Sequence, residues 1–168
     1  MKKREILTRE EKIILMPDVC TLLGIINETM IHGINLDVVQ RVNDSTDEFL
    51  KYCYTLIVCG LEPKVCKFVL SNMAENEGDD FKRIKMRIQK DAILTLQHED
   101  AFNLSSIIIF SYFGLDFKND FIKYIRKYSL SIYNLLFVND DFIYSLETTI
   151  RTLNANLQFI TLDRSTKQ

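Results

Sequence analysis

The sequence predicts an all-α fold, a compact array of about seven to eight helices that forms a single domain over residues 1–168. One reason is the scarcity of helix breakers, because the 168 residues include only five glycines and two prolines. The second reason is that apolar residues recur three and four positions apart along most of the chain, which gives each helix one apolar face. Together these observations disfavour a turn-rich β-sandwich.

The first helix is expected to begin at Thr8, because Thr8 and Glu11 match a capping box in which each side chain bonds to the other residue's backbone amide. Pro17 is expected to break or kink it, since proline removes a hydrogen-bond donor and clashes with the preceding turn. The helix then continues to about His32, and Gly33 ends it.

Three helices are expected next. Asn35 is expected to cap a short helix. The four residues from Ser45 to Glu48 match a second capping box, and the helix that they begin is expected to end at Gly60. Pro63 suits the first position of the following helix, where a missing amide hydrogen is tolerated.

A polar loop at residues 75–80 separates this half of the chain from the next. Asp79 or Asp80 is expected to cap the helix after the loop, because an aspartate side chain accepts a hydrogen bond from a first-turn amide. An apolar helix is then expected to begin near Asn103 and to end at Gly114.

Two further caps predict the last helices. Asp116 is expected to cap a helix that bends near Ser129 and Ser131. Asp140 is expected to cap a C-terminal helix over residues 140–161, whose apolar residues again recur at helical spacing.

Residues 22–76 and 80–138 resemble each other, which predicts an internal repeat of two stacked three-helix units. Each unit would contain a helix, an apolar helix closed by glycine, and an amphipathic helix with a charged start. The glycine turns align as Gly60–Lys64 with Gly114–Lys118. Units of this kind bury their apolar faces by stacking. The alternative is that any two amphipathic three-helix segments would align as well.

The composition narrows the class of protein. Hydrophobic residues make up 47% of the chain, enough to form a core, so the composition is not that of a disordered protein. The formal net charge of −2 argues against a strongly basic nucleic-acid-binding protein. The four cysteines form no CxxC pair and the two histidines are far apart, so we predict no metal site and no cofactor. Such cysteines are typical of the reducing cytoplasm, which we predict as the location.

No catalytic residue is predicted. The chain has no glycine-rich phosphate-binding loop, no HExxH motif and no GxSxG motif. The paired aspartates Asp79 and Asp80 are explained as helix caps, and His98 as the histidine of a helix end. We therefore predict a protein without enzymatic activity.

Residues 22–75 carry an ordered series of short matches to one known family. The matching pieces are Gly33–Asp37, Phe49–Leu50, Leu56–Val58, Gly60 and Glu62–Pro63, followed by the acidic residues Glu75 and Glu77. In order and spacing this segment resembles the cytoplasmic segment of the A subunit of the bacterial flagellar stator, the MotA family.

The resemblance implies a role at a motor but not torque generation. The family couples ion flow to torque through membrane helices. This chain is expected to have no membrane span, because its most apolar stretch, Leu104–Phe113, is about half of the roughly 20 residues that a membrane helix needs. The family contacts the rotor through one basic and one acidic residue. Asp37 stands at the acidic position, whereas the basic position falls near Met30 and Ile31, so that charge is lost.

The favoured hypothesis is a cytoplasmic, non-catalytic protein-interaction module, a soluble relative of the stator segment that acts at a flagellar motor. Its contacts with a protein partner are expected to come from charged side chains on the loops and helices of residues 37–90. These predicted contact residues are Asp37, Glu62, Lys64, Lys67, Lys82, Arg83, Arg87 and Lys90.

Two alternatives stay open. Aromatic residues are concentrated between Phe102 and Phe159, and the commonest use of such residues is to pack in a core. They would otherwise form a groove for an amphipathic partner peptide, as in a helical regulator or chaperone, or an interface between identical copies of the chain. The basic residues of the helix at 82–90 would form a stripe for nucleic acid, although a solvated helix face is the commoner use of such a pattern.

Overall fold

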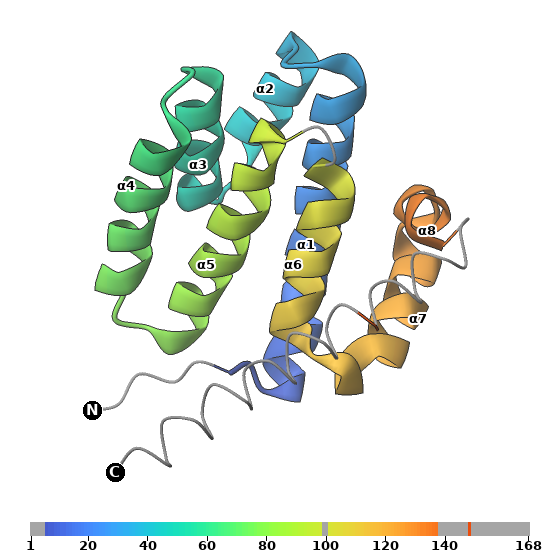
Figure 1. The fold of residues 1–168 in the computed structure, drawn as a ribbon. Helices are drawn as coiled ribbons and strands as arrows, with labels where there is room; N and C mark the ends of the chain where they lie inside the picture. Colours follow the sequence, from blue (N-terminus) through green and yellow to red (C-terminus); the bar gives the residue numbers. More distant parts are fainter. Residues whose placement is uncertain (1–5, 99–100, 138–147, 149–168) are drawn as a thin grey trace.

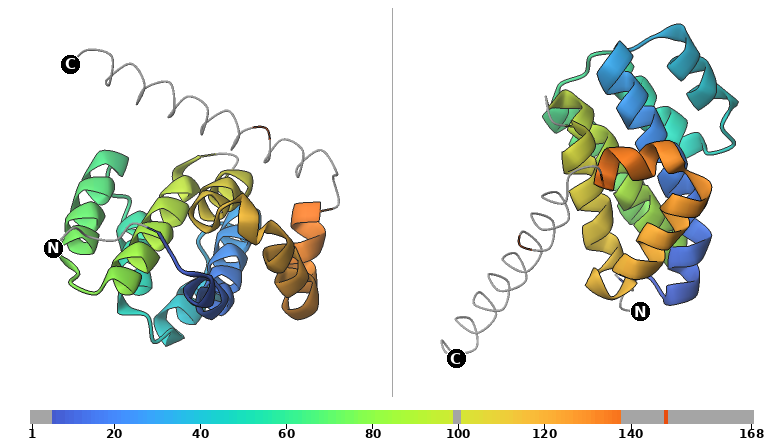
Figure 2. Two further views of the ribbon diagram at one scale, coloured as in Figure 1. Left: turned by 90° about the horizontal axis from the view of Figure 1, so that it is seen from below. Right: turned by 90° about the vertical axis from the view of Figure 1, so that its right-hand side faces the viewer.

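The computed structural model describes residues 6–98, 101–137 and 148. This part of the chain contains eight α-helices and two short 3₁₀ helices, and no strand among the described residues, so the predicted all-α fold is confirmed. In Figure 1, α4, α5 and α6 lie side by side; α3 packs against α4 and α5, and α1 packs against α6. Helices α7 and α8 pack against each other and against α1, on the side away from α4 (Figures 1 and 2).

Helix α1 (Arg9–His32) begins as predicted. The Thr8 hydroxyl oxygen accepts a hydrogen bond from the Glu11 amide at 3.3 Å, and a Glu11 carboxylate oxygen accepts one from the Thr8 amide at 2.8 Å. Of the break or kink predicted at Pro17, the break is wrong, because the helix continues through this residue. Buried Met16 and Val19 on either side of Pro17 hold this segment in the core, and packing of this kind offsets the loss of one helical hydrogen bond.

The next helices are α2 (Leu36–Asp44), α3 (Glu48–Val58) and α4 (Pro63–Asn76). Asn35 caps α2 and Pro63 is the first residue of α4, both as predicted. The predicted capping box at Ser45 is wrong, because Asp47 caps α3 by accepting a hydrogen bond from the Leu50 amide at 3.0 Å. Ser45 instead accepts a bond from the Asp47 amide.

Asp79 caps α5 (Asp80–Leu94), which runs into the 3₁₀ helix η1 (Thr95–Gln97). After η1 come α6 (Ala101–Phe113), η2 (Leu115–Phe117), α7 (Lys118–Tyr128) and α8 (Leu130–Phe137). The end of α7 before α8 matches the bend predicted near Ser129. The predicted C-terminal helix over 140–161 lies outside the described residues.

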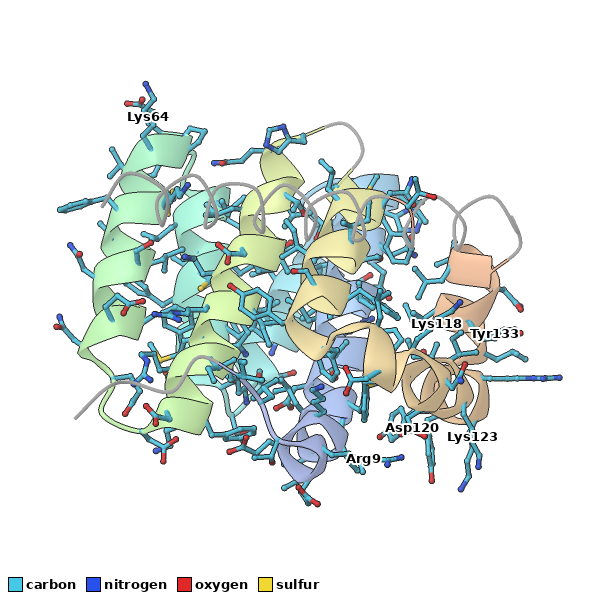
Figure 3. All side chains as sticks on the ribbon, turned by 60° about the horizontal axis from the view of Figure 1, so that its bottom comes forward. Arg9, Lys64, Lys118, Asp120, Lys123 and Tyr133 are labelled. Carbon is cyan, nitrogen blue, oxygen red and sulfur yellow. The ribbon has the colours of Figure 1, made fainter. Side chains whose placement is uncertain are left out.

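The predicted cap at Asp116 is wrong. Asp116 lies within η2, and α7 begins after Phe117 without a side-chain cap. The Asp116 carboxylate is instead drawn toward α1, where it accepts a hydrogen bond from the buried Lys12 side chain at 3.4 Å. A second ion pair joins Arg9 of α1 to Asp120 of α7 at 2.5 Å, and Figure 3 shows these two residues next to each other.

One hydrophobic core runs through both predicted repeat units. It combines Leu50 and Leu70 of the first unit with Ile88 and Phe110 of the second, and the buried face of α1 joins them. The glycines that align in the repeat, Gly60 and Gly114, have similar backbone φ angles of 68° and 78°. The glycine turns are therefore alike, while the repeat as a whole stays a prediction.

Helix α1 is long and apolar enough to cross a membrane by length and composition. No segment of that length was expected from the sequence. The expectation rested on uninterrupted apolar stretches, whereas the apolar residues of α1 are interspersed with charged ones such as Asp18 and Glu28. A buried core helix passes the same test. In this fold α1 contacts α2, α5, α6, α7 and α8, and its buried residues, among them Leu22 and Leu23, belong to the hydrophobic core.

We predict that Gly114→Ala lowers the free energy of unfolding by about 2 kcal/mol. A positive φ of 78° costs an L-residue about 1–2 kcal/mol, and a Cβ here would lie 2.7 Å from an Asp116 carboxylate oxygen, so the pair with Lys12 would be disturbed. Urea denaturation followed by circular dichroism measures the loss. Gly60→Ala is the matched control, since its φ of 68° is similar and nothing lies within 4 Å of a Cβ there. Equal losses in the two variants would contradict a role for Asp116.

Candidate functional site

A groove opens between the start of α4, the end of α5 and the exposed side of α6, with a volume of about 710 Å³. We call it the α4–α6 groove. Its apolar surface comes mainly from α5 and α6, and two lysines of α4 stand beside it. Its lining includes Lys64, Lys67, Leu94, Leu104, Ile108 and Tyr112.

Lys64 and Lys67 lie in the first turns of α4, which begins at Pro63, and both side chains are exposed. Figure 3 shows Lys64 at the outer end of α4. The spacing of three residues places the two ammonium groups on the same side of the helix. The groove therefore has an apolar lining with positive charge along one edge.

A hydrogen-bonded network of polar side chains lies beside this apolar surface. The Tyr112 hydroxyl donates to an Asp91 carboxylate oxygen at 2.6 Å. Lys90 pairs with the other Asp91 oxygen at 3.1 Å and donates to the Ser71 hydroxyl at 3.3 Å. Burial, together with the hydrogen bond to Asp91 and its charge, raises the pKa of Tyr112 above its ordinary value of 10.0. Tyr112 is thus a neutral donor at physiological pH and holds one wall of the groove in place.

The predicted basic face of α5 is not present as an exposed surface. Arg83 is only 1% exposed and its guanidinium donates to Asp80, while Lys90 is buried beside Asp91. Arg87 is partly buried and pairs with Glu75 at 2.6 Å. The prediction that Arg83 and Lys90 are surface contacts is therefore wrong, because both side chains are buried and pair with carboxylates of α5 itself.

Of the predicted basic residues on α5, Lys82 is exposed. The continuous basic stripe that nucleic-acid binding would require is interrupted by acidic partners of the neighbouring residues.

Asp37 and Glu62 are exposed but lie outside the α4–α6 groove. Asp37 stands in the first turn of α2, between exposed Leu36 and buried Val38, and Glu62 precedes the first residue of α4. The structure thus brings together Lys64 and Lys67 at the groove, whereas Asp37, Glu62 and Lys82 do not line it. Partner binding by these residues stays a prediction.

Five phenylalanines of the second half are buried in the hydrophobic core and do not line a groove. Phe110 and Phe121 meet edge to face with ring centroids 5.0 Å apart, and Phe113 lies 5.6 Å from Phe121. Phe102 and Phe117 are buried as well. The hypothesis of an aromatic groove is wrong for these five. Of the phenylalanines and tyrosines in the described part of the chain, Tyr112 lines the α4–α6 groove.

The sequence did not indicate a cluster of ionic residues where α1, α3 and α5 meet. The Lys85 ammonium pairs with Asp18 at 2.7 Å and with Asp47 at 2.8 Å, and the Gln89 amide nitrogen donates to Asp47 at 2.7 Å. Burial raises the pKa of Asp47, but the hydrogen bonds from Lys85, the Leu50 amide and Gln89 outweigh it, so the pKa is lowered from 3.8. The cap on α3 is therefore tied to two other helices.

We predict that the stability conferred by Asp47 is lost in acid. Because its pKa is lower in the folded than in the unfolded protein, this contribution is present above about pH 4 and disappears as the pH falls through the folded-state value. Asp47→Asn keeps a capping oxygen but has no charge to lose. Urea denaturation between pH 6 and pH 3, measured at about half-unit steps, should show a steeper decline for the wild type. Equal slopes in the two proteins would contradict the assignment.

The described residues contain no group of three or more histidine, cysteine or acidic side chains that could hold a metal ion. Burial raises the pKa of Cys20 to about 11 and raises that of the Cys53 thiol too. These two cysteines are therefore protonated at neutral pH, which suits packing rather than nucleophilic chemistry. Cys66 is buried, while Cys59 is exposed.

No family model, curated protein or solved structure matches this chain. The α4–α6 groove is therefore interpreted from its own geometry and charge.

Proposed function

We propose that this protein is a cytoplasmic, non-catalytic protein-interaction module that binds the apolar face of an acidic amphipathic helix in the α4–α6 groove. The observation that carries the proposal is a groove of about 710 Å³ whose apolar lining includes Leu104 and Ile108 and whose edge carries Lys64 and Lys67. Binding of this kind uses apolar anchors three, four and seven residues apart along the bound helix.

The charge at the edge of the groove specifies the kind of partner. Asp91 lies in the groove but is already paired with Lys90 and Tyr112, so its charge is compensated. Lys64 and Lys67 are exposed and lie beside the apolar lining. A partner helix with glutamate or aspartate on its polar face would place those carboxylates against the two lysines, which favours it over a basic helix of the same shape.

The proposal predicts that reversing the charge at the groove reverses the preference for peptides. Two synthetic peptides of about 16 residues would share one leucine face, with glutamate on the polar face of one and lysine on that of the other. Fluorescence anisotropy measures their affinities. The wild type should bind the glutamate peptide about tenfold more tightly, and Lys64→Glu/Lys67→Glu should favour the lysine peptide.

Two further variants separate the groove from general charge effects. Lys123→Glu/Lys127→Glu makes the same change in charge on α7, outside the groove, and should leave the preference as in the wild type. Ile108→Asp places a charge in the apolar lining and should abolish binding of both peptides. The proposal is wrong if both peptides bind alike, or if the change on α7 shifts their affinities as much as the change on α4.

A second candidate concerns the partner's identity and rests on Asp37. This residue, which stands at the acidic position of the stator resemblance, is exposed in the first turn of α2 next to exposed Leu36 and near exposed Ile34. We propose a component of the flagellar motor as the partner that this surface meets. Affinity purification from the native host should recover a motor component with the wild type and less of it with Asp37→Lys. Recovery of no motor component would exclude this candidate and leave the groove proposal intact.

A further inference from the structure

A second hollow, separate from the α4–α6 groove, lies at the other end of α5. It has a volume of about 760 Å³ and is bounded by Asp18 of α1, by the loop before α3, by α3, by the end of α4 and by α5. We call it the α3–α5 pocket. It contains the Asp47 and Lys85 cluster described above and is lined by Gln89.

Gln89 presents a hydrogen-bond acceptor with no partner. The residue is only 4% exposed, and its Oε1 atom is buried without a partner among the described residues. The orientation of the amide is set by Asp47, because the Nε2 atom donates to that carboxylate at 2.7 Å and a reversed amide would bring two acceptors together. A buried acceptor in this state costs free energy unless a donor reaches it. An N–H or O–H group that enters the pocket and reaches this oxygen would remove that cost.

The charge of the pocket favours a cationic donor. Its lining includes four carboxylates, of Asp18, Asp47, Glu48 and Glu77, against two lysine ammonium groups. One of these ammonium groups, that of Lys85, already bridges Asp18 and Asp47. The other belongs to the exposed Lys82. A third ammonium group, that of Lys51, lies outside the lining and pairs with Glu48 at 2.8 Å. Four carboxylates against three ammonium groups leave an excess of one negative charge at the pocket.

The walls fit the stem of a long side chain. Phe49 and Tyr52 contribute aromatic rings, and Met73 and Met86 contribute flexible thioethers. Tyr52 and Met73 are among the exposed large hydrophobic residues of the fold. Aromatic faces attract a cation electrostatically, and methionine adapts its shape to an alkyl chain.

We propose that the α3–α5 pocket binds the arginine side chain of a partner protein. A guanidinium is a planar cation with five N–H donors, so it can donate to Gln89 Oε1 and to a carboxylate of Glu48 or Glu77 at the same time. Its alkyl stem would lie against Tyr52 and Met73. The pocket is an arginine site whether or not the α4–α6 groove binds an acidic helix, because the two sites share no residue.

The test titrates the full chain, labelled with nitrogen-15, with N-acetyl-arginine methylamide. The side-chain amide signals of Gln89 should shift and saturate. The matched probe is N-acetyl-citrulline methylamide, which has the same shape but a neutral urea, and it should bind at least about tenfold more weakly because the charged hydrogen bonds are lost.

Two conservative variants locate the site. Glu48→Gln and Glu77→Gln keep the size of partly or fully exposed side chains, and each should weaken arginine binding a few-fold. Glu10→Gln, an exposed acid of α1 outside the pocket, should leave it unchanged. The proposal is overturned if the Gln89 signals do not saturate, which would mean that water satisfies the acceptor. Equal binding of arginine and citrulline, or equal effects of all three variants, would overturn it as well.

Discussion

Arg83→Ala is expected to lower the free energy of unfolding by about 3 kcal/mol, although the sequence suggests a surface residue. The side chain is 1% exposed, and its guanidinium donates to Asp80 and, at 3.4 Å, to the Glu77 carbonyl oxygen. Removing the guanidinium leaves these acceptors short of a donor and removes the packing of the long alkyl stem. Urea denaturation followed by circular dichroism measures the loss.

Lys82→Ala is the matched control. Lys82 directly precedes Arg83 in α5 and was predicted to lie on the same basic surface, but in the structure Lys82 is exposed whereas Arg83 is buried. It should change the stability by less than about 0.5 kcal/mol. Arg83→Met, which restores most of the stem, should lose less than Arg83→Ala. Equal, small losses for Arg83→Ala and Lys82→Ala would show that Arg83 is not held inside the fold.

Leu23→Ala is expected to lower the free energy of unfolding by about 2–5 kcal/mol, the range for deleting a buried leucine side chain. Leu23 lies in the middle of α1 and has no exposed surface. Because α1 packs against helices from both halves of the chain, a cavity at this position weakens the one core that they share. Urea denaturation measures the effect, and the slope of the unfolding curve should stay that of the wild type.

Ile14→Ala is the control on the same helix, since this side chain is 64% exposed. Its loss should stay below about 0.5 kcal/mol. Comparable losses for Leu23→Ala and Ile14→Ala would contradict the placement of α1 with one face in the core and the other exposed. The pair also tests the role of α1 directly, because its length and composition alone would allow a membrane helix.

Local chemistry made the helix ends predictable. The capping box of Thr8 and Glu11 and the cap by Asp79 depend on residues no more than three positions apart. Pro63 at a first helical position and Gly114 at a positive φ are likewise properties of single residues. Such signals lie within a few residues of one another, so they can be found without the fold.

The local signals failed where a distant residue competed for the same side chain. From its sequence position Asp116 was expected to cap a helix. Its carboxylate instead accepts a hydrogen bond from the ammonium group of Lys12, 104 positions earlier in the chain. Ser45 was expected to cap α3, but Asp47 does so and is also bound by Lys85 and Gln89 of α5. In both places the tertiary partner lies too far along the chain to be found from spacing.

The charges of α5 show the same limit. Spacing alone cannot tell whether Arg83 and Lys90 face water or the neighbouring helices. An amphipathic pattern distinguishes the apolar face of a helix from its polar face, but it does not show whether another helix packs against the polar face. Only the packing of α5 against α4 and the pairing with Asp80 and Asp91 made these cations internal.

The sequence by itself determined that this chain is helical, where most of its helices begin and end, and that Lys64 and Lys67 stand on an exposed turn of α4. These are consequences of backbone hydrogen bonding and of intervals of three or four residues. Only the tertiary structure decided that α1 joins both halves in one core, that Phe110 and Phe121 are internal, and that α4, α5 and α6 enclose a groove. Those outcomes depend on contacts between residues that are far apart in the chain. The spacing of neighbouring residues does not determine the geometry of such contacts.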